Sequence, residues 1–148
     1  MKILLLNGPN LNMLGTREPE IYGRDTVDDI VGRVKALAAE LGVEIEAYQS
    51  NHEGALVDFI QQHQASADGM IINPGAFGHY SYAIRDAITG SSLPAIEVHI
   101  SNVHARGEPF RETLVLSAMS KGVITGLGWQ GYLHALQWLV TTLKETGK

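Results

Sequence analysis

Short hydrophobic runs alternate along the chain with longer segments in which hydrophobic residues recur every three or four positions. The short runs have the length of β-strands, and they are nearly continuous in hydrophobic residues, as in strands buried on both faces of a parallel sheet. They lie at residues 2–6, 43–48, 69–73, 95–98 and 122–125. The periodic segments predict helices at residues 27–41, 53–66, 79–89 and 130–145.

The alternation of strand and helix predicts an α/β fold, a three-layer, doubly wound, five-stranded parallel sheet. A chain of 148 residues without a Pro- or Ser-rich linker is expected to form a single domain over residues 1–148. Ligands of such sheets bind beyond the carboxyl ends of the strands. Two connections, residues 7–25 and 100–114, are long for this fold, so we expect them to form lids or binding loops.

Charge and composition narrow the range of partners. The chain has 11 Lys and Arg against 16 Asp and Glu, a net charge of −5, and its arginines are scattered. It therefore lacks the basic stripe that binds nucleic acid or anionic lipid, and we expect neither a nucleic-acid nor a membrane partner. The absence of Cys excludes disulfides and thiolate zinc sites. No run approaches the ~20 hydrophobic residues that span a bilayer, and no signal peptide is evident, so a cytoplasmic location is expected.

The fourth hydrophobic run ends with a carboxylate and an imidazole two residues apart. In a strand, Glu97 and His99 would face the same side. A neighbouring carboxylate raises the proton affinity of an imidazole and orients it, as a general acid requires. The alternative is a partly buried ion pair with a structural role. A metal site at His99 and His104 is less attractive, because no Cys assists and Arg106 would repel a cation.

Two other turn regions carry candidate chemistry. Residues 7–23 match neither the GxGxxG nor the GxxxxGK(S/T) pattern of phosphate-binding loops. The candidates that remain in this segment are Arg17 and Tyr22. The alternative is that they are a surface Arg and a Tyr packed on the core edge. Residues 73–81 could hold an anion on their backbone amides, or Asn73 could simply cap the turn. No Lys has the surroundings of a Schiff-base amine, so imine chemistry is not expected.

Five segments in the same order closely resemble the type II 3-dehydroquinate dehydratases, or 3-dehydroquinases, over nearly the whole chain. They are GPNLN at 8–12 leading to YG at 22–23, QSNHEG at 49–54, NPGAF at 73–77, AIRDA at 83–87 and EVHISN at 97–102. The resemblance implies a hydro-lyase with a flavodoxin-like fold that reversibly dehydrates 3-dehydroquinate to 3-dehydroshikimate through an enolate. It places this step in the shikimate pathway of aromatic amino acid biosynthesis. It also implies that no metal or other cofactor is used and that the protein is a homo-oligomer, a dodecamer of trimers.

The resemblance further implies roles for five residues in the reaction. Tyr22 would remove the proton next to the substrate ketone, and Arg17 would activate Tyr22. A free Tyr titrates near ~10, and a close cation can lower this value by ~1 to 3 units. Asn10, directly or through a held water, would stabilise the enolate oxygen. His99, oriented by Glu97, would protonate the departing hydroxyl.

The remaining implied roles bind substrate. Asn73 and the amides of Ile100 and Ser101 would cradle the carboxylate, His79 and Arg111 would grip the ring hydroxyls, Arg106 would assist binding, and Asp86 would come from a neighbouring subunit. Three segments depart from the family pattern. Residues 78–80 read Gly-His-Tyr instead of Thr-His-Thr, the stretch 106–111 is one residue longer between its arginines, and residues 114–117 replace Ser-Tyr-Leu-Ser.

Two other functions suit the same predicted architecture. A flavodoxin-like flavin- or phosphate-binding module would need a hydroxyl- and Gly-rich loop after the first strand, where this chain has Pro-Asn-Leu-Asn. A phosphoacceptor signalling domain would need clustered acids at the end of that strand, where Asn7 stands. A lyase is favoured, because candidates for the base, the oxyanion donor, the acid and the anion site all follow strands at one edge of the sheet.

Overall fold

The structure, a computed structural model, describes residues 1–16 and 18–147, without the side chain of Tyr22. Its centre is one five-stranded sheet in the order β2-β1-β3-β4-β5, and every neighbouring pair is parallel. The strands are β1 (Lys2–Asn7), β2 (Glu44–Gln49), β3 (Gly69–Asn73), β4 (Ala95–His99) and β5 (Gly122–Thr125). This is the flavodoxin-like strand order, and it confirms the predicted doubly wound fold.

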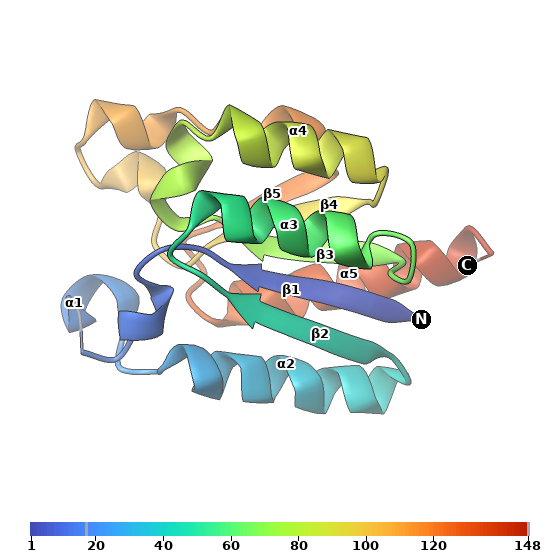
Figure 1. Cartoon of the computed structure of the whole chain (residues 1–148). Helices are drawn as coiled ribbons and strands as arrows, with labels where there is room; N and C mark the ends of the chain where they lie inside the picture. Colours follow the sequence, from blue (N-terminus) through green and yellow to red (C-terminus); the bar gives the residue numbers. More distant parts are fainter. Residues whose placement is uncertain (17, 148) are drawn as a thin grey trace.

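Helices cover both faces of the sheet and complete three layers (Figure 1). On one face lie α2 (Val27–Leu41) and α5 (Gln130–Glu145), and on the other lie α3 (Glu53–His63) and α4 (Tyr82–Ser91). Side chains of β1 alternate between the two cores. Ile3 and Leu5 pack with α2 and α5, whereas Leu4 and Leu6 pack with α3 and α4.

The predicted helices are present, with differences at three ends, one of which is that α4 runs to Ser91 instead of residue 89. The Thr26 side chain accepts a hydrogen bond from the Asp29 amide, and the Asp29 carboxylate accepts one from the Thr26 amide, so α2 begins with a capping box. The helix α3 ends at His63 instead of residue 66. The helix expected from residue 79 begins at Tyr82, because residues 75–79 form a 3-10 turn and Ser81 caps α4 through the Ile84 amide.

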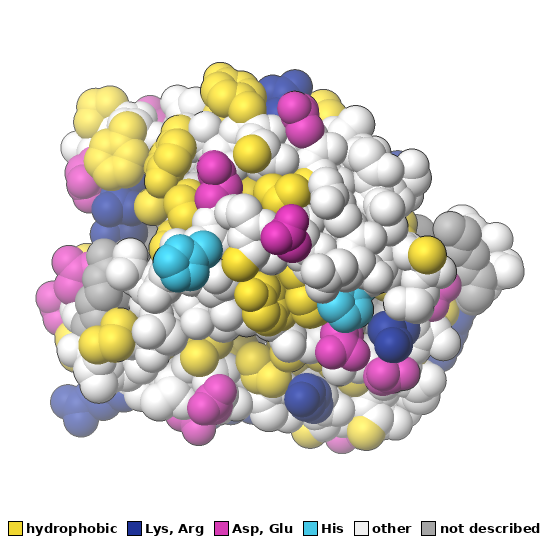
Figure 2. Space-filling view, in the orientation of Figure 1, with side chains coloured by type: hydrophobic (Ala, Val, Ile, Leu, Met, Phe, Trp, Pro, Cys, Tyr) yellow, Lys and Arg dark blue, Asp and Glu magenta, His cyan; other side chains and the backbone are white. Residues whose placement is uncertain are grey.

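The two edge strands are less buried than their sequences predicted. Five residues of β2 are partly buried and one is exposed, and Val123 in β5 is 38% exposed. An edge strand has a neighbour on one side only, and the flanking helices cover the middle of the sheet most fully. Figure 2 shows hydrophobic side chains gathered below α3. The ring of Tyr48 in β2 stacks on the ring of Phe59 in α3, with centroids 4.6 Å apart.

Both long connections lie at the carboxyl edge of the sheet (Figure 1). The connection from β1 to α2 carries a 3-10 turn, η1 (Leu11–Met13), and a short helix, α1 (Pro19–Tyr22). The connection from β4 to β5 carries three 3-10 turns, η3 (Val103–Ala105), η4 (Pro109–Glu112) and η5 (Ser117–Met119). None of the described helices is long and apolar enough to cross a membrane.

Candidate active site

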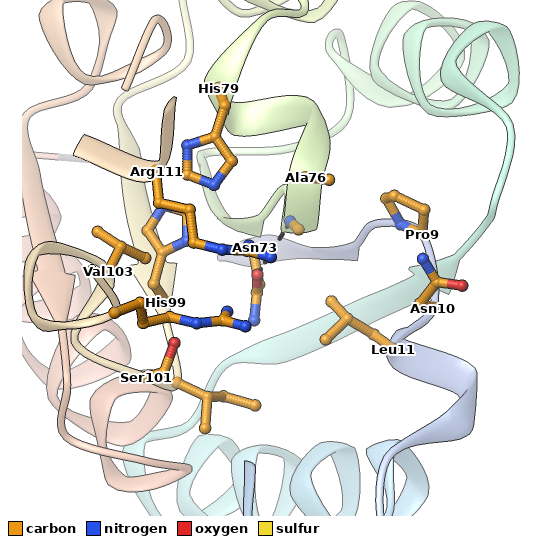
Figure 3. Close-up of a pocket in the computed structure, with 13 residues that line it drawn as sticks. Pro9, Asn10, Leu11, Asn73, Ala76, His79, His99, Ser101, Val103 and Arg111 are labelled. Atoms are coloured by element: carbon orange, nitrogen blue, oxygen red, sulfur yellow. Dashed lines mark hydrogen bonds between the residues drawn. The ribbon is translucent and has the colours of Figure 1, made fainter. Parts of the chain in front are cut away.

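A cavity opens at the carboxyl edge of the sheet, beside the point where the strand order reverses between β1 and β3 (Figure 3). Three stretches of the chain line it: residues 9–11 after β1, residues 73–79 at and after β3, and residues 99–111 at and after β4. His79, His99 and Arg111 lie on one side and Asn10 lies opposite, with Asn73 between them. The cavity therefore occupies the place that doubly wound folds give to ligands.

A buried polar network holds Asn73, which lines the cavity. The Tyr132 hydroxyl donates to Asn7 Oδ1 at 2.7 Å and accepts from Asn73 Nδ2 at 2.8 Å. The Gly75 amide donates to Asn73 Oδ1 at 3.1 Å, so Asn73 does cap its turn, and its amide group is held in one orientation. Complete burial raises the pKa of Tyr132, which keeps the hydroxyl protonated. Sequence reasoning missed Tyr132, because it lies within the hydrophobic periodicity of α5.

The Glu97–His99 pair stands at the end of β4. Glu97 is fully buried, and its Oε1 accepts a hydrogen bond from His99 Nε2 at 2.7 Å. A carboxylate partner fixes the hydrogen on Nε2, which leaves Nδ1 of the ring for proton exchange with a ligand. The second carboxylate oxygen accepts from the Ser117 hydroxyl at 2.7 Å. The predicted same-side arrangement of Glu97 and His99 is confirmed, and Ser117 was not foreseen.

His79 forms a second imidazole in the cavity wall, 6.1 Å from the His99 ring between centroids. Its Nδ1 donates to the Thr113 carbonyl at 2.9 Å, so Nε2 is left as a hydrogen-bond acceptor. Burial lowers the pKa of His79, and the nearby His99 and Arg111 lower it further, against the opposing effects of the Thr113 hydrogen bond and Glu97. The ring is therefore neutral at pH 7 and suited to accept a hydrogen bond from a ligand hydroxyl.

This lowered pKa predicts an acid-dependent loss of stability. As the pH falls, the unfolded chain protonates His79 near its ordinary value of about 6.5, whereas the folded protein binds that proton only at lower pH. The folded state thus loses stability from about pH 6.5 down through the lowered pKa. We expect His79→Asn, which keeps an N–H for Thr113, to show a shallower fall of Tm from about pH 7 to about pH 5. Parallel curves for wild type and variant would contradict this assignment.

Two arginines give the cavity a positive wall, although the whole chain carries a net charge of −5. The Arg111 Nε donates to Glu108 Oε1 at 2.8 Å, and its guanidinium lies 4.8 Å from the centre of the Phe110 ring. This hydrogen bond is the main cause that lowers the pKa of Glu108. The stretch between Arg106 and Arg111 ends in η4 (Pro109–Glu112), and both side chains line the cavity. A small anion is the ligand that such a wall favours.

The structure gathers most of the predicted site residues around this cavity. Those that line it are Asn10, Asn73, His79, His99, Ile100, Ser101, Arg106 and Arg111. Glu97 lies buried next to His99. Arg17 and the side chain of Tyr22 lie outside the described residues, and the backbone of Tyr22 ends α1.

Among the predicted site residues that the structure describes, Asp86 lies away from this cavity. It is exposed on α4 and lines a separate depression between α3 and α4. In the described part of the chain, no group of three or more His, Cys, Asp or Glu is placed to hold a metal ion.

The fold is that of a doubly wound α/β protein, and its cavity holds an imidazole paired with a buried carboxylate beside two arginines. The family model described as "Dehydroquinase class II" matches residues 1–140, and the chain belongs to this family.

Relatives named for the same activity match nearly the whole chain. The chain is 56% identical to the 3-dehydroquinate dehydratase of Roseiflexus castenholzii, over 96% of this chain and 90% of the relative. It is 55% identical to the catabolic 3-dehydroquinase of Aspergillus clavatus, over 97% and 95%. The crystal structure of the type II dehydroquinase from Butyrivibrio crossotus matches with a TM-score of 0.91 and 49% identity, over 94% of this chain and 97% of that one.

Proposed function

We propose that the protein dehydrates 3-dehydroquinate to 3-dehydroshikimate, as a hydro-lyase of the class II dehydroquinase family. The observation that carries this function is the buried Glu97–His99 pair beside a cavity with a positive wall. The substrate combines a carboxylate, ring hydroxyls and a ketone, so it needs an anion site, hydrogen-bond partners and groups that move protons. A flavin-binding module would not need the acid pair.

The reaction begins with removal of a proton from the carbon next to the ketone. We assign the base to Tyr22 and its activation to Arg17, because both stand in the segment that resembles the family motif. The electron pair left by the proton forms an enolate, whose oxygen requires a donor aimed at the developing charge. Asn10, directly or through a held water, is our candidate for this donor, and it lies across the cavity from His99 (Figure 3).

The second step expels the hydroxyl group. We assign the acid to His99, which delivers a proton from Nδ1 to the departing oxygen while Nε2 stays bonded to Glu97. The enolate electrons return to form the ketone and a conjugated carbon–carbon double bond, and the hydroxyl leaves as water. The proton taken by Tyr22 and the proton given by His99 thus balance, and both side chains return to their starting states through solvent.

Substrate binding is assigned to the rest of the cavity wall. We place the substrate carboxylate at Asn73 and the amides of Ile100 and Ser101, which lie at the ends of β3 and β4. His79 would accept a hydrogen bond from a ring hydroxyl through Nε2. Arg111 would donate to another hydroxyl, and Arg106 would assist binding.

We further propose that the protein works as a homo-oligomer built from trimers, a dodecamer, in which Asp86 completes a neighbouring subunit's site. Asp86 is exposed on α4 and does not line its own chain's cavity, which is what a contribution to another subunit requires. The expected cytoplasmic location stays a prediction.

Borohydride provides a test of the imine-free route. Among the described residues that line the cavity there is no Lys, so substrate should not form a reducible imine there. We expect the protein incubated with substrate and borohydride, then freed of both, to keep its mass and its activity. Because borohydride also reduces the free ketone, the readout is the mass of the protein. A substrate-sized adduct on a lysine would overturn the mechanism.

The function itself is tested by ultraviolet absorbance, since the product is a conjugated enone and the substrate is not. Purified protein in excess chelator should convert 3-dehydroquinate to this enone. If the purified protein forms no enone from 3-dehydroquinate, the proposed function is wrong.

A further inference from the structure

We propose that Ser117 is a positioning residue for the acid, and that its hydroxyl holds the Glu97 carboxylate in the orientation that aligns His99. This inference rests on the proposed function, in which His99 protonates the departing hydroxyl. It adds a third member to the pair, joined in the order Ser117, Glu97, His99.

The geometry of the three side chains is that of a relay. Each oxygen of the Glu97 carboxylate accepts one hydrogen bond of 2.7 Å, Oε1 from His99 Nε2 and Oε2 from the Ser117 hydroxyl. Both distances are short, as expected when the acceptor is charged. Glu97 is completely buried, so water does not compete for these positions. The Glu97 carboxylate is therefore held at both of its oxygens by residues that the structure describes.

The local fold explains why Ser117 reaches this carboxylate. The Val115 amide donates to the Gly78 carbonyl at 2.9 Å, which joins the segment before η5 to the turn beside the catalytic pair. Leu116 is fully buried in the core with α3 and α4. Ser117 is thus the next residue after two anchored positions, and its hydroxyl reaches Glu97 in β4.

Gly78 closes the other side of the pair. A Cβ at this position would come within 3.3 Å of His99 Cε1, 3.5 Å of Glu97 Oε1 and 2.7 Å of Pro74 Cγ. The backbone of the turn therefore packs directly on the two side chains. On this side the carboxylate has packing contacts, and none of the described residues donates a hydrogen bond to it from there. The second oxygen of Glu97 therefore depends on the Ser117 hydroxyl for its hydrogen bond.

Loss of that hydroxyl should act on the chemical step. A buried carboxylate with an unsatisfied oxygen either rotates to find a donor or binds a proton, and both changes weaken the hold on His99 Nε2–H. Ser117 does not line the cavity, so the substrate would keep all of its direct contacts. The change should therefore appear in kcat and leave KM nearly unaltered.

The experiment compares three variants in the enone assay. Ser117→Ala removes the hydroxyl, Ser117→Thr keeps it, and Ser120→Ala is the matched control. The Ser120 hydroxyl lies in the same segment but donates to the Leu116 carbonyl at 3.1 Å. We expect Ser117→Ala to lower kcat about 10- to 100-fold with KM within about twofold of wild type. Ser117→Thr should retain at least about a third of the wild-type kcat, and Ser120→Ala should match wild type within about twofold.

Thermal melting distinguishes positioning from a purely structural role. If Ser117 merely ties η5 to β4, Ser117→Ala lowers Tm and leaves kcat of the folded protein unchanged, and this result overturns the proposal. Equal losses in Ser117→Ala and Ser117→Thr, or a rise in KM at constant kcat, overturn it as well. Failure of the proposed function is separate, because wild-type protein would then form no enone at all.

Discussion

Replacing His99 with alanine is expected to lower kcat by about a thousandfold or more while KM changes less than about threefold. The His99 imidazole lines the cavity. One ring nitrogen is hydrogen-bonded to the buried Glu97 carboxylate, and the other is left for a ligand. Without the imidazole, the hydroxyl must depart as hydroxide, which is a far poorer leaving group than water. Substrate affinity should persist, because the carboxylate contacts assigned to Asn73 and to the amides of Ile100 and Ser101 remain.

His104→Ala is the matched control for this variant. His104 lies in η3, is exposed and does not line the cavity, so its removal deletes the same kind of side chain five residues after His99. We expect its kcat and KM to equal those of wild type. A His99→Ala protein that keeps the wild-type kcat would assign the acid to another group.

Replacing Tyr22 with phenylalanine is expected to abolish measurable turnover, a loss of at least about a thousandfold, with substrate affinity nearly intact. The change deletes one oxygen, and with it the site that takes the proton from the carbon next to the ketone. The aromatic ring itself is kept. Steady-state kinetics should show the loss in kcat, and equilibrium binding of substrate to the inactive variant should give its affinity directly.

Tyr80→Phe serves as the control for the tyrosine substitution. Tyr80 is 58% exposed and does not line the cavity, so loss of its hydroxyl should leave the rate unchanged. Retention of the wild-type rate by Tyr22→Phe would remove Tyr22 as the base. A large rise in KM without a fall in kcat would instead make it a binding residue.

The sequence was sufficient for the architecture because the periodicities of the core elements are strong. The helix at residues 130–145 was predicted to its ends, since seven of its residues are buried and recur on one face. The helix expected at residue 79 starts later, because Ser81 satisfies the first-turn amide and the preceding residues fold into η2. Burial of the edge strands was overestimated, because hydrophobic content alone does not show how many neighbours a strand has.

The site was predictable where its chemistry follows a strand. Glu97 and His99 share a face by strand geometry, and Asn73 is the last residue of β3, so their meeting at one edge came from local rules. Ser117 lies 20 residues beyond Glu97 in an irregular connection, and its contact depends on the path of the chain around the cavity. The proposed role of Asp86 in a neighbouring subunit's site stays a prediction, because it comes from the family resemblance and not from local spacing in this chain.

Separate roles for Tyr22 and His99 can be resolved by following hydrogen exchange at the carbon next to the substrate ketone. In D₂O, the variant His99→Ala should exchange this hydrogen faster than buffer alone and form no enone, because the enolate still forms and then takes deuterium. Tyr22→Phe should exchange no faster than buffer. Equal, enzyme-dependent exchange in the two variants would contradict a reaction in which Tyr22 removes the proton and His99 expels the hydroxyl.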